Sequence, residues 1–203
     1  MSLKHLIIGT VLAICTFAAQ AAAQKNELSG MLGRTFISNQ GIQGAPSYDS
    51  VLRSGNGFTF EVNYARRVMD GSIWSLAVEV PFVVNHDEDL HTYANPFLSY
   101  QSYFVTPAAR LNLFPEQAVS PWVSFGGGFG HFSANSGGSN SNSTGNATGV
   151  LQAGLGLDVK IFGRFSLRGE ARDFWSGMPD LNVNTGKSRQ HNIFVAGGLV
   201  WHF

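Results

Sequence analysis

The sequence predicts an all-β protein, an eight-stranded antiparallel up-and-down transmembrane β-barrel. Three observations predict it: apolar residues alternate with small or polar residues, the connections between such stretches are alternately long and short, and charged residues are few. Only 13% of the 203 residues are charged, which is about half the share of an ordinary soluble domain. The 13 basic and 13 acidic residues give no net charge, so no basic surface for nucleic acid is predicted.

Residues 1–23 have the composition of a secretory signal peptide. Lys4 precedes a short apolar run, and three consecutive alanines then supply the small residues of a cleavage site. The run is shorter than the roughly 20 residues that a membrane-spanning helix needs. The single cysteine, Cys15, lies inside this segment. We therefore expect a signal peptide at 1–23 and a β-barrel domain at 24–203 that has no disulfide and no thiolate metal site.

Seven stretches of the chain alternate with a period of two residues, as strands with one apolar face do. In one of them, Trp74 and every second residue as far as Val84 are apolar, whereas Ser75 and Glu79 have the other parity. The seven stretches are 58–68, 73–84, 104–114, 122–132, 150–161, 165–174 and 192–203. Each has about ten residues, the length that a tilted membrane-spanning strand requires.

The first of the eight strands is expected at about 27–37. This stretch is amphipathic, but Met31 and Arg34 disagree about which of its faces is apolar, so the orientation of this strand stays open. Pro81 and Pro107 lie within two other predicted strands. Because a closed barrel has no free edge for proline, we expect a bulge or early fraying at the outer ends of these two strands.

The connections between the predicted strands alternate in length. Short turns follow the second, fourth and sixth strands. The long connections, which are rich in Ser, Asn and Gly, are 38–57, 85–103, 133–149 and 175–191. Transmembrane barrels have this asymmetry, with tight periplasmic turns and longer extracellular loops.

The apolar parity is expected to face lipid, and the other parity to face a narrow lumen. A soluble barrel would need many polar residues on its outside, whereas here the polar parity has one or two charges per strand among Gly, Ala and Ser. The charges expected inside are Glu61, Glu79, Arg110, Arg168, Glu170 and Arg172. Because isolated buried charges are costly, we expect a structural ion-pair network that fixes strand register. A path for solutes or protons through these residues is the alternative.

Aromatic residues cluster near the ends of the predicted strands, as the belts at membrane interfaces do. The expected periplasmic rim consists of Phe114, Trp122, Phe162, Phe165, Trp201 and Phe203. The expected outer rim consists of Phe58, Phe82, Tyr103, Phe132, Phe174 and Trp175. These aromatic side chains are predicted to anchor the barrel in the membrane rather than to contact a ligand.

The last six residues, Gly198 to Phe203, resemble the aromatic-terminated final strand of bacterial outer-membrane proteins. With the signal peptide and the eight strands, the whole mature chain resembles the small OmpA/OmpX-like outer-membrane β-barrel family. Three short segments resemble the sequences that usually mark the strands of this family. They are Leu28–Gly30, Tyr103–Phe114 and Arg172–Phe174. The resemblance implies a monomer in the bacterial outer membrane, in contact with lipid and lipopolysaccharide and without a cofactor. It also implies that Trp201 and Phe203 form the signal that the barrel-assembly machinery reads.

Two short motifs suggest chemistry. His131 and Ser133 resemble the His and Ser pair of lipid A deacylases, in which the serine attacks an ester. No acidic residue lies between Ser133 and Asp158 to orient the histidine, so we expect no catalytic residues and an interfacial His131. The stretch from His86 to His91 contains three acidic residues and could hold a divalent cation. We expect a solvated acidic loop there and no metal site.

These observations favour a non-enzymatic protein with an envelope-structural or surface-interaction role, carried by four extracellular loops on a rigid scaffold. Two alternatives stay open: a small pore through the charged lumen, and a lipid A-modifying enzyme that uses His131 and Ser133. The sequence does not name a loop ligand.

Overall fold

The computed structural model describes residues 25–37, 40–41, 51–54, 57–91, 98–136, 145–178 and 188–203. The expected signal peptide at 1–23 lies outside the described residues, as do parts of all four long connections. Within the described ranges, every regular element is a β-strand. No helix among them has the length and apolar character needed to cross a membrane.

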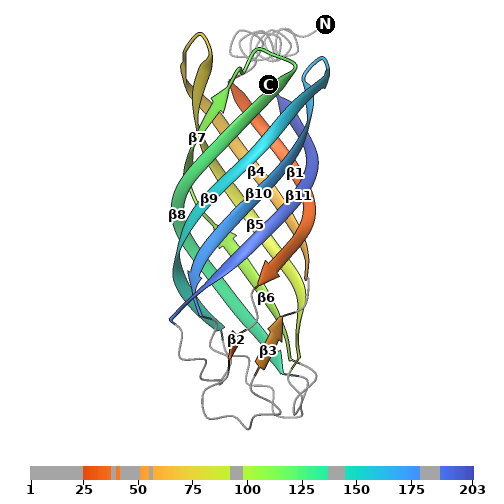
Figure 1. The fold of residues 1–203 in the computed structure, drawn as a ribbon, viewed down its shortest axis with the longest axis vertical. Helices are drawn as coiled ribbons and strands as arrows, with labels where there is room; N and C mark the ends of the chain where they lie inside the picture. Colours follow the sequence, from red (N-terminus) through yellow and green to blue (C-terminus); the bar gives the residue numbers. More distant parts are fainter. Residues whose placement is uncertain are drawn as a thin grey trace, which may run out of the picture.

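The strands form one closed antiparallel barrel, in which they are tilted steeply against the long axis (Figure 1). The wall consists of β1 (Asn26–Ile37), β4 (Gly57–Asp70), β5 (Trp74–His91), β6 (Leu98–Val105), β7 (Ala108–Leu113), β8 (Val119–Ser136), β9 (Gly145–Phe162), β10 (Phe165–Gly177) and β11 (Arg189–His202). The last strand, β11, pairs with β1 and closes the sheet. Because β6 and β7 are two halves of one strand between β5 and β8, the described wall has the eight strands that the sequence predicts.

Strand β4 illustrates how the sequence specifies this fold. Phe58, Phe60 and Val62 point outward and are 46–54% exposed, whereas Thr59 and Glu61 between them are at most 1% exposed. Successive side chains of a strand point to opposite faces, and a closed sheet leaves no backbone donor or acceptor unpaired in lipid. The alternating sequence therefore becomes a barrel with an apolar outside and a mainly polar inside.

The sequence left open which face of β1 points outward. In the structure, the face that carries Leu28, Leu32 and Phe36 points outward. These three side chains are 40–52% exposed on the outer face. Arg34 shares their parity and is also exposed, while Met31 is 1% exposed and points into the lumen. Met31 faces inward because it packs in an apolar cluster inside the barrel.

The predicted strand ends were wrong at the loop end of the barrel, where the wall continues further than expected. Strand β5 runs to His91 and β8 to Ser136, within stretches predicted as loops. Two short strands, β2 (Gln40–Gly41) and β3 (Val51–Ser54), lie in the first predicted loop, and β3 pairs with β5 beyond the end of β4 (Figure 1). A membrane-spanning strand needs about 9–11 residues, so the outer part of the wall does not need an apolar face.

The two prolines lie in the middle of the wall, not at the outer strand ends where the sequence placed them. Thr106 and Pro107 separate β6 from β7, and the strand then resumes. Pro81 stays inside β5, opposite this break, and its carbonyl oxygen accepts a hydrogen bond from Thr106 N at 3.4 Å. The missing N–H of Pro81 therefore faces the break as well. On the other side, a Cβ atom on Gly126 would overlap the Pro107 carbonyl oxygen, so the break needs glycine in β8.

A charge on the outer face is expected to destabilise the barrel. Leu155, in the middle of β9, is 61% exposed, and Leu155→Arg is expected to lower the free energy of unfolding by about 2–4 kcal/mol. The control Ile73→Arg lies in the turn before β5, where the side chain is 60% exposed, and is expected to cost about 0–1 kcal/mol. Urea unfolding in lipid vesicles measures both, and equal losses would contradict the assigned faces.

Candidate functional site: the lumen and its periplasmic mouth

The lumen contains a layer of charged side chains. The structure places all six predicted charges there, and each is at most 5% exposed. Arg172 of β10 lies among three carboxylates from β4, β5 and β10. Its Nη1 atom is 2.7 Å from Glu79 Oε1, and its Nε atom is 3.0 Å from Glu170 Oε1 and 3.3 Å from Glu61 Oε2. This cluster connects strands that are not neighbours in the sheet.

A second cluster continues the network towards the end of the barrel where the short turns lie. Arg168 donates two hydrogen bonds to Asp158, at 2.6 and 2.7 Å, and one to Glu27 at 3.2 Å. Arg110 also pairs with Glu27, and its Nη1 atom is 3.4 Å from Glu79 Oε2. Glu79 thus links Arg110 to the Arg172 cluster. Sequence reasoning missed Glu27 and Asp158, although both have inward parity, because they lie close to strand ends.

Trp122 lies inside this charged layer, and its prediction as a rim anchor was wrong. Its side chain is 2% exposed, and its Nε1 atom donates a hydrogen bond to Asp158 at 3.2 Å. The guanidinium carbons that lie 5.1–5.6 Å from its ring centroid belong to Arg110, Arg168 and Arg172. These contacts are cation–π interactions. Trp122 has the inward parity of Ser124, and this was the signal in the sequence that could have placed it.

An apolar cluster fills the lumen on the loop side of the charged layer. Its members are Met31, Val83, Phe104, Phe132, Val150, Phe174, Phe194 and Ala196. We call this cluster the aromatic plug. The Phe104 ring stacks on Phe174 at 5.0 Å between centroids and meets Phe132 edge-on at 5.8 Å. The sequence placed Phe132 and Phe174 on the outer rim, which was wrong because both have inward parity.

The charged layer and the aromatic plug together close the lumen. Arg110, Phe104 and Phe194 are each at most 1% exposed, as expected when packed side chains fill a barrel. Eight strands enclose an interior that is just wide enough for side chains to fill. The lumen is therefore accessible only near the two ends of the barrel, as far as the described residues show.

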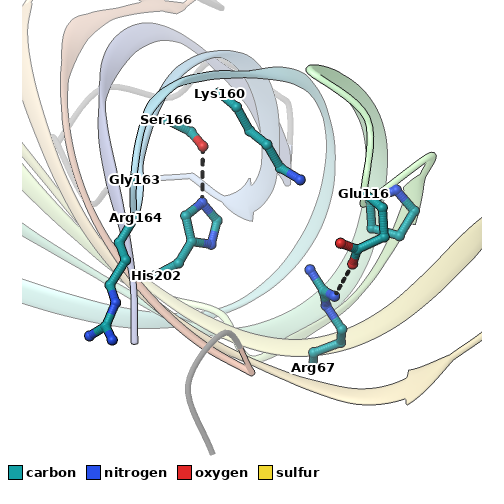
Figure 2. A pocket seen from close by; sticks show the side chains of 8 residues that line it. Arg67, Glu116, Lys160, Gly163, Arg164, Ser166 and His202 are labelled. Atoms are coloured by element: carbon teal, nitrogen blue, oxygen red, sulfur yellow. Dashed lines mark hydrogen bonds and ion pairs between the residues drawn. The ribbon is translucent and has the colours of Figure 1, made fainter. Parts of the chain in front are cut away.

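A cavity of about 180 Å³ opens at the mouth of the lumen on the side of the short turns. The polar and charged side chains that line it are Arg67, Glu116, Lys160, Arg164, Ser166 and His202. Figure 2 shows the Arg67 guanidinium bonded to Glu116, at 3.1 Å, and the His202 ring bonded to Ser166, at 3.0 Å. We call this cavity the mouth pocket. Sequence reasoning missed it, because its residues come from strand ends and turns that are far apart in the chain.

Comparisons with known proteins assign the chain to a family. The family model described as "Outer membrane protein beta-barrel domain" matches residues 9–203. The chain belongs to this family. It is therefore a protein of the bacterial outer membrane, and the long connections of this outer-membrane barrel are extracellular. No curated protein sequence in the comparison matches this chain.

Solved outer-membrane barrels have a similar fold at low sequence identity. Neisserial surface protein A (NspA) is 14% identical with a TM-score of 0.62, covering 89% of this chain and 99% of that chain. OprG from Pseudomonas aeruginosa is 13% identical with a TM-score of 0.54, covering 90% of this chain and 97% of that chain. The outer membrane enzyme PagL is 11% identical with a TM-score of 0.43, covering 85% and 97%. At these identities the likeness to NspA and OprG shows the fold alone.

In this outer-membrane barrel, His131 and Ser133 lie two residues apart on β8, near its loop end. His131 is exposed on the outer face of β8, as predicted, and Ser133 is partly buried two residues further on. No hydrogen bond joins the two described side chains. Their partners in the neighbouring strands are Tyr103, Ala147, Gln101 and Gly145, and none of these is acidic.

The possible cation site between His86 and His91 falls largely outside the described residues. His86 is described and exposed, whereas the side chains of 87–91 are not described. Where side chains are described, no cluster of three or more His, Cys, Asp or Glu residues is arranged to hold a metal ion.

The final strand of this outer-membrane barrel ends with two aromatic side chains in contact. Trp201 is 43% exposed on the outer face, and its ring centroid lies 4.7 Å from that of Phe203. The Phe203 N–H donates a hydrogen bond to the Asn26 carbonyl oxygen at 2.9 Å. The end of β11 is thereby attached to the start of β1, at the seam that closes the barrel.

Proposed function

We propose that this outer-membrane barrel is a non-enzymatic scaffold with an envelope-structural or surface-interaction role, carried by its four extracellular loops. The observation that carries the proposal is the closed lumen, in which ion pairs and stacked rings connect strands across the interior. A rigid scaffold of this kind holds loops in place, and loops on rigid scaffolds commonly carry binding residues. The apolar outer face of the barrel would contact lipid and lipopolysaccharide.

A loop-replacement experiment tests this function. In a deletion strain, we compare the wild-type chain with a variant in which residues 137–144 are replaced by a short Gly-Ser segment. The control replaces the periplasmic turn Gly163–Arg164 with Asn-Gly. We expect all three proteins to fold and insert, and only the extracellular replacement to reduce surface adhesion or resistance to detergents. A further variant is shortened in all four extracellular loops. If this variant kept the surface adhesion and the detergent resistance of the wild type, the proposal would be contradicted.

The pore alternative is tested by electrical recording. We expect no steady conductance from the purified barrel in planar bilayers, because side chains that are almost completely buried fill the lumen. A steady conductance that Arg110→Ala alters would contradict this expectation and favour a pore through the charged layer.

The enzyme alternative is tested by mass spectrometry of lipid A. Because His131 has no orienting carboxylate among its strand partners, we expect expression of the chain to leave the mass of lipid A unchanged. A mass change that Ser133→Ala abolishes would overturn the non-enzymatic assignment.

We also propose that Trp201 and Phe203 act as the signal for the barrel-assembly machinery. The exposed Trp201 ring and the adjacent, partly buried Phe203 ring at the closing seam support this role. Phe203→Ala is expected to slow assembly in cells but not refolding into detergent. The control Phe162→Ala removes a ring that is 67% exposed in the turn region of the same rim. Equal slowing by both variants would contradict a specific signal.

A further inference from the structure

The mouth pocket has the features of a binding site for a small anion. We propose that it binds a molecule bearing a phosphate or carboxylate group at the periplasmic end of the barrel. The pocket is open to the periplasm and has a volume of about 180 Å³, which is room for a small molecule. This role is independent of the extracellular loops, which lie at the opposite end of the barrel.

Cationic side chains that are not fully paired line the mouth pocket. Lys160 and Arg67 both extend towards its centre, whereas Arg164 points away (Figure 2). Lys160, near the end of β9, has no ion-pair or hydrogen-bond partner for its ammonium group among the described side chains. A phosphate or carboxylate in the pocket would lie within reach of this group, and charge-assisted hydrogen bonds of this kind are the strong ones.

Arg67 supplies a second donor group. Its Nη1 atom is paired with Glu116, at 3.1 Å, and lies 3.6 Å from Asp70. Its Nε atom is buried and has no hydrogen-bond partner. A buried donor without a partner is costly, and this one gains an acceptor only if the guanidinium turns towards an anion in the mouth pocket. Because Glu116 is 72% exposed in its turn, an incoming anion can replace or join it on the guanidinium.

The remaining wall of the pocket is polar and held in place. The Ser166 hydroxyl and the His202 Nε2 atom are 3.0 Å apart, and the His202 Nδ1 atom lies 3.7 Å from Glu27 Oε1. Below them, the acids Glu27 and Asp158 are engaged by Arg168. The deep carboxylates are therefore already paired with cations, while the cations at the mouth are only partly paired with carboxylates.

The ligand could come from the periplasm or from the inner leaflet. A soluble periplasmic anion and a phospholipid headgroup share the same phosphate chemistry. The pocket lies at the mouth, between the turn at Gly163–Arg164 and the turn that contains Glu116, and both sources reach this position. The two sources are distinguished by the probes that the test uses.

The test measures binding to the folded full-length barrel and to three single variants. Isothermal titration in a non-ionic detergent uses inorganic phosphate and citrate as soluble probes. Native mass spectrometry from nanodiscs measures retention of phosphatidylglycerol. Lys160→Gln and Arg67→Gln each remove one charge of the pocket. The control Lys25→Gln removes a charge at the same end of the barrel, where Lys25 lies 3.8 Å from Asp70 and does not line the pocket.

We expect Lys160→Gln and Arg67→Gln each to weaken binding at least fivefold, and Lys25→Gln to leave it unchanged. Loss with phosphate or citrate identifies a soluble anion, and loss of phosphatidylglycerol retention alone identifies a headgroup. The proposal is overturned if no probe binds the wild-type chain, or if Lys25→Gln weakens binding as much as Lys160→Gln. A folding defect in Arg67→Gln, seen as a changed gel mobility without heating, leaves Lys160→Gln as the deciding variant.

Discussion

Replacing Arg172 by methionine is expected to lower the free energy of unfolding by about 3–5 kcal/mol, because it leaves buried carboxylates without their cation. Glu61, Glu79 and Glu170 all lie within 3.3 Å of this guanidinium. Arg172 also donates hydrogen bonds to Glu79 at 2.7 Å and to Glu170 at 3.0 Å. Urea unfolding in lipid vesicles measures the loss.

Two comparisons separate this effect from a general loss of charge. Arg66→Met removes an exposed arginine from the outer face of β4 and is expected to change stability by less than about 1 kcal/mol. The double variant Arg172→Met/Glu170→Gln removes one of the stranded carboxylates and is expected to be more stable than Arg172→Met alone. An Arg172→Met barrel as stable as the wild type would contradict a structural role for the network.

Phe104→Ala is expected to lower the free energy of unfolding by about 3–5 kcal/mol, because it leaves a cavity in the aromatic plug. Phe104 is 1% exposed and contacts both Phe132 and Phe174. The control Phe60→Ala truncates a ring that is 46% exposed on the outer face, where lipid chains can fill the space. A similar loss for both variants would show that the plug contributes no more to stability than the lipid-facing rings do.

The sequence predicts the strand order, the closure and the two faces because lipid imposes a strict pattern. Most outward positions within the membrane must be apolar, and this requirement fixes the parity of β4, β5 and β9. The six lumen charges follow from the same parity. At the loop end of the wall, β8 continues to Ser136 in a stretch rich in Ser, Asn and Gly. Outside the membrane, water replaces lipid around the wall, so the alternation of apolar and polar residues is no longer required. The sequence therefore does not indicate where the strand ends.

Sequence reasoning misplaces the interior residues for which residue type and parity predict opposite faces of the barrel. Trp122, Phe132 and Phe174 resemble interface anchors by type, yet their parity places them inside, and the structure follows parity. Glu27 and Asp158 belong to the charged layer, but sequence reasoning did not place them there because they lie near strand ends. The mouth pocket depends on how two turns and the end of β11 come together, and no local pattern in the chain specifies this contact.

The most direct test of the inward charge and outward apolar surface is a nitroxide scan along β9. Residues 24–203 contain no cysteine, so single cysteines at 151–157 can be introduced one at a time and treated with a nitroxide reagent in vesicles. We predict that cysteines at odd-numbered positions, including Leu151, Leu155 and Leu157, take up the label and are relaxed by oxygen dissolved in lipid. Cysteines at even-numbered positions, including Gln152, should not react in the folded barrel, because Gln152 is fully buried and a Cβ atom at Gly154 or Gly156 already overlaps neighbouring side chains. Uniform labelling along the strand, or access of a water-soluble nickel complex to labels inside the barrel, would contradict the account.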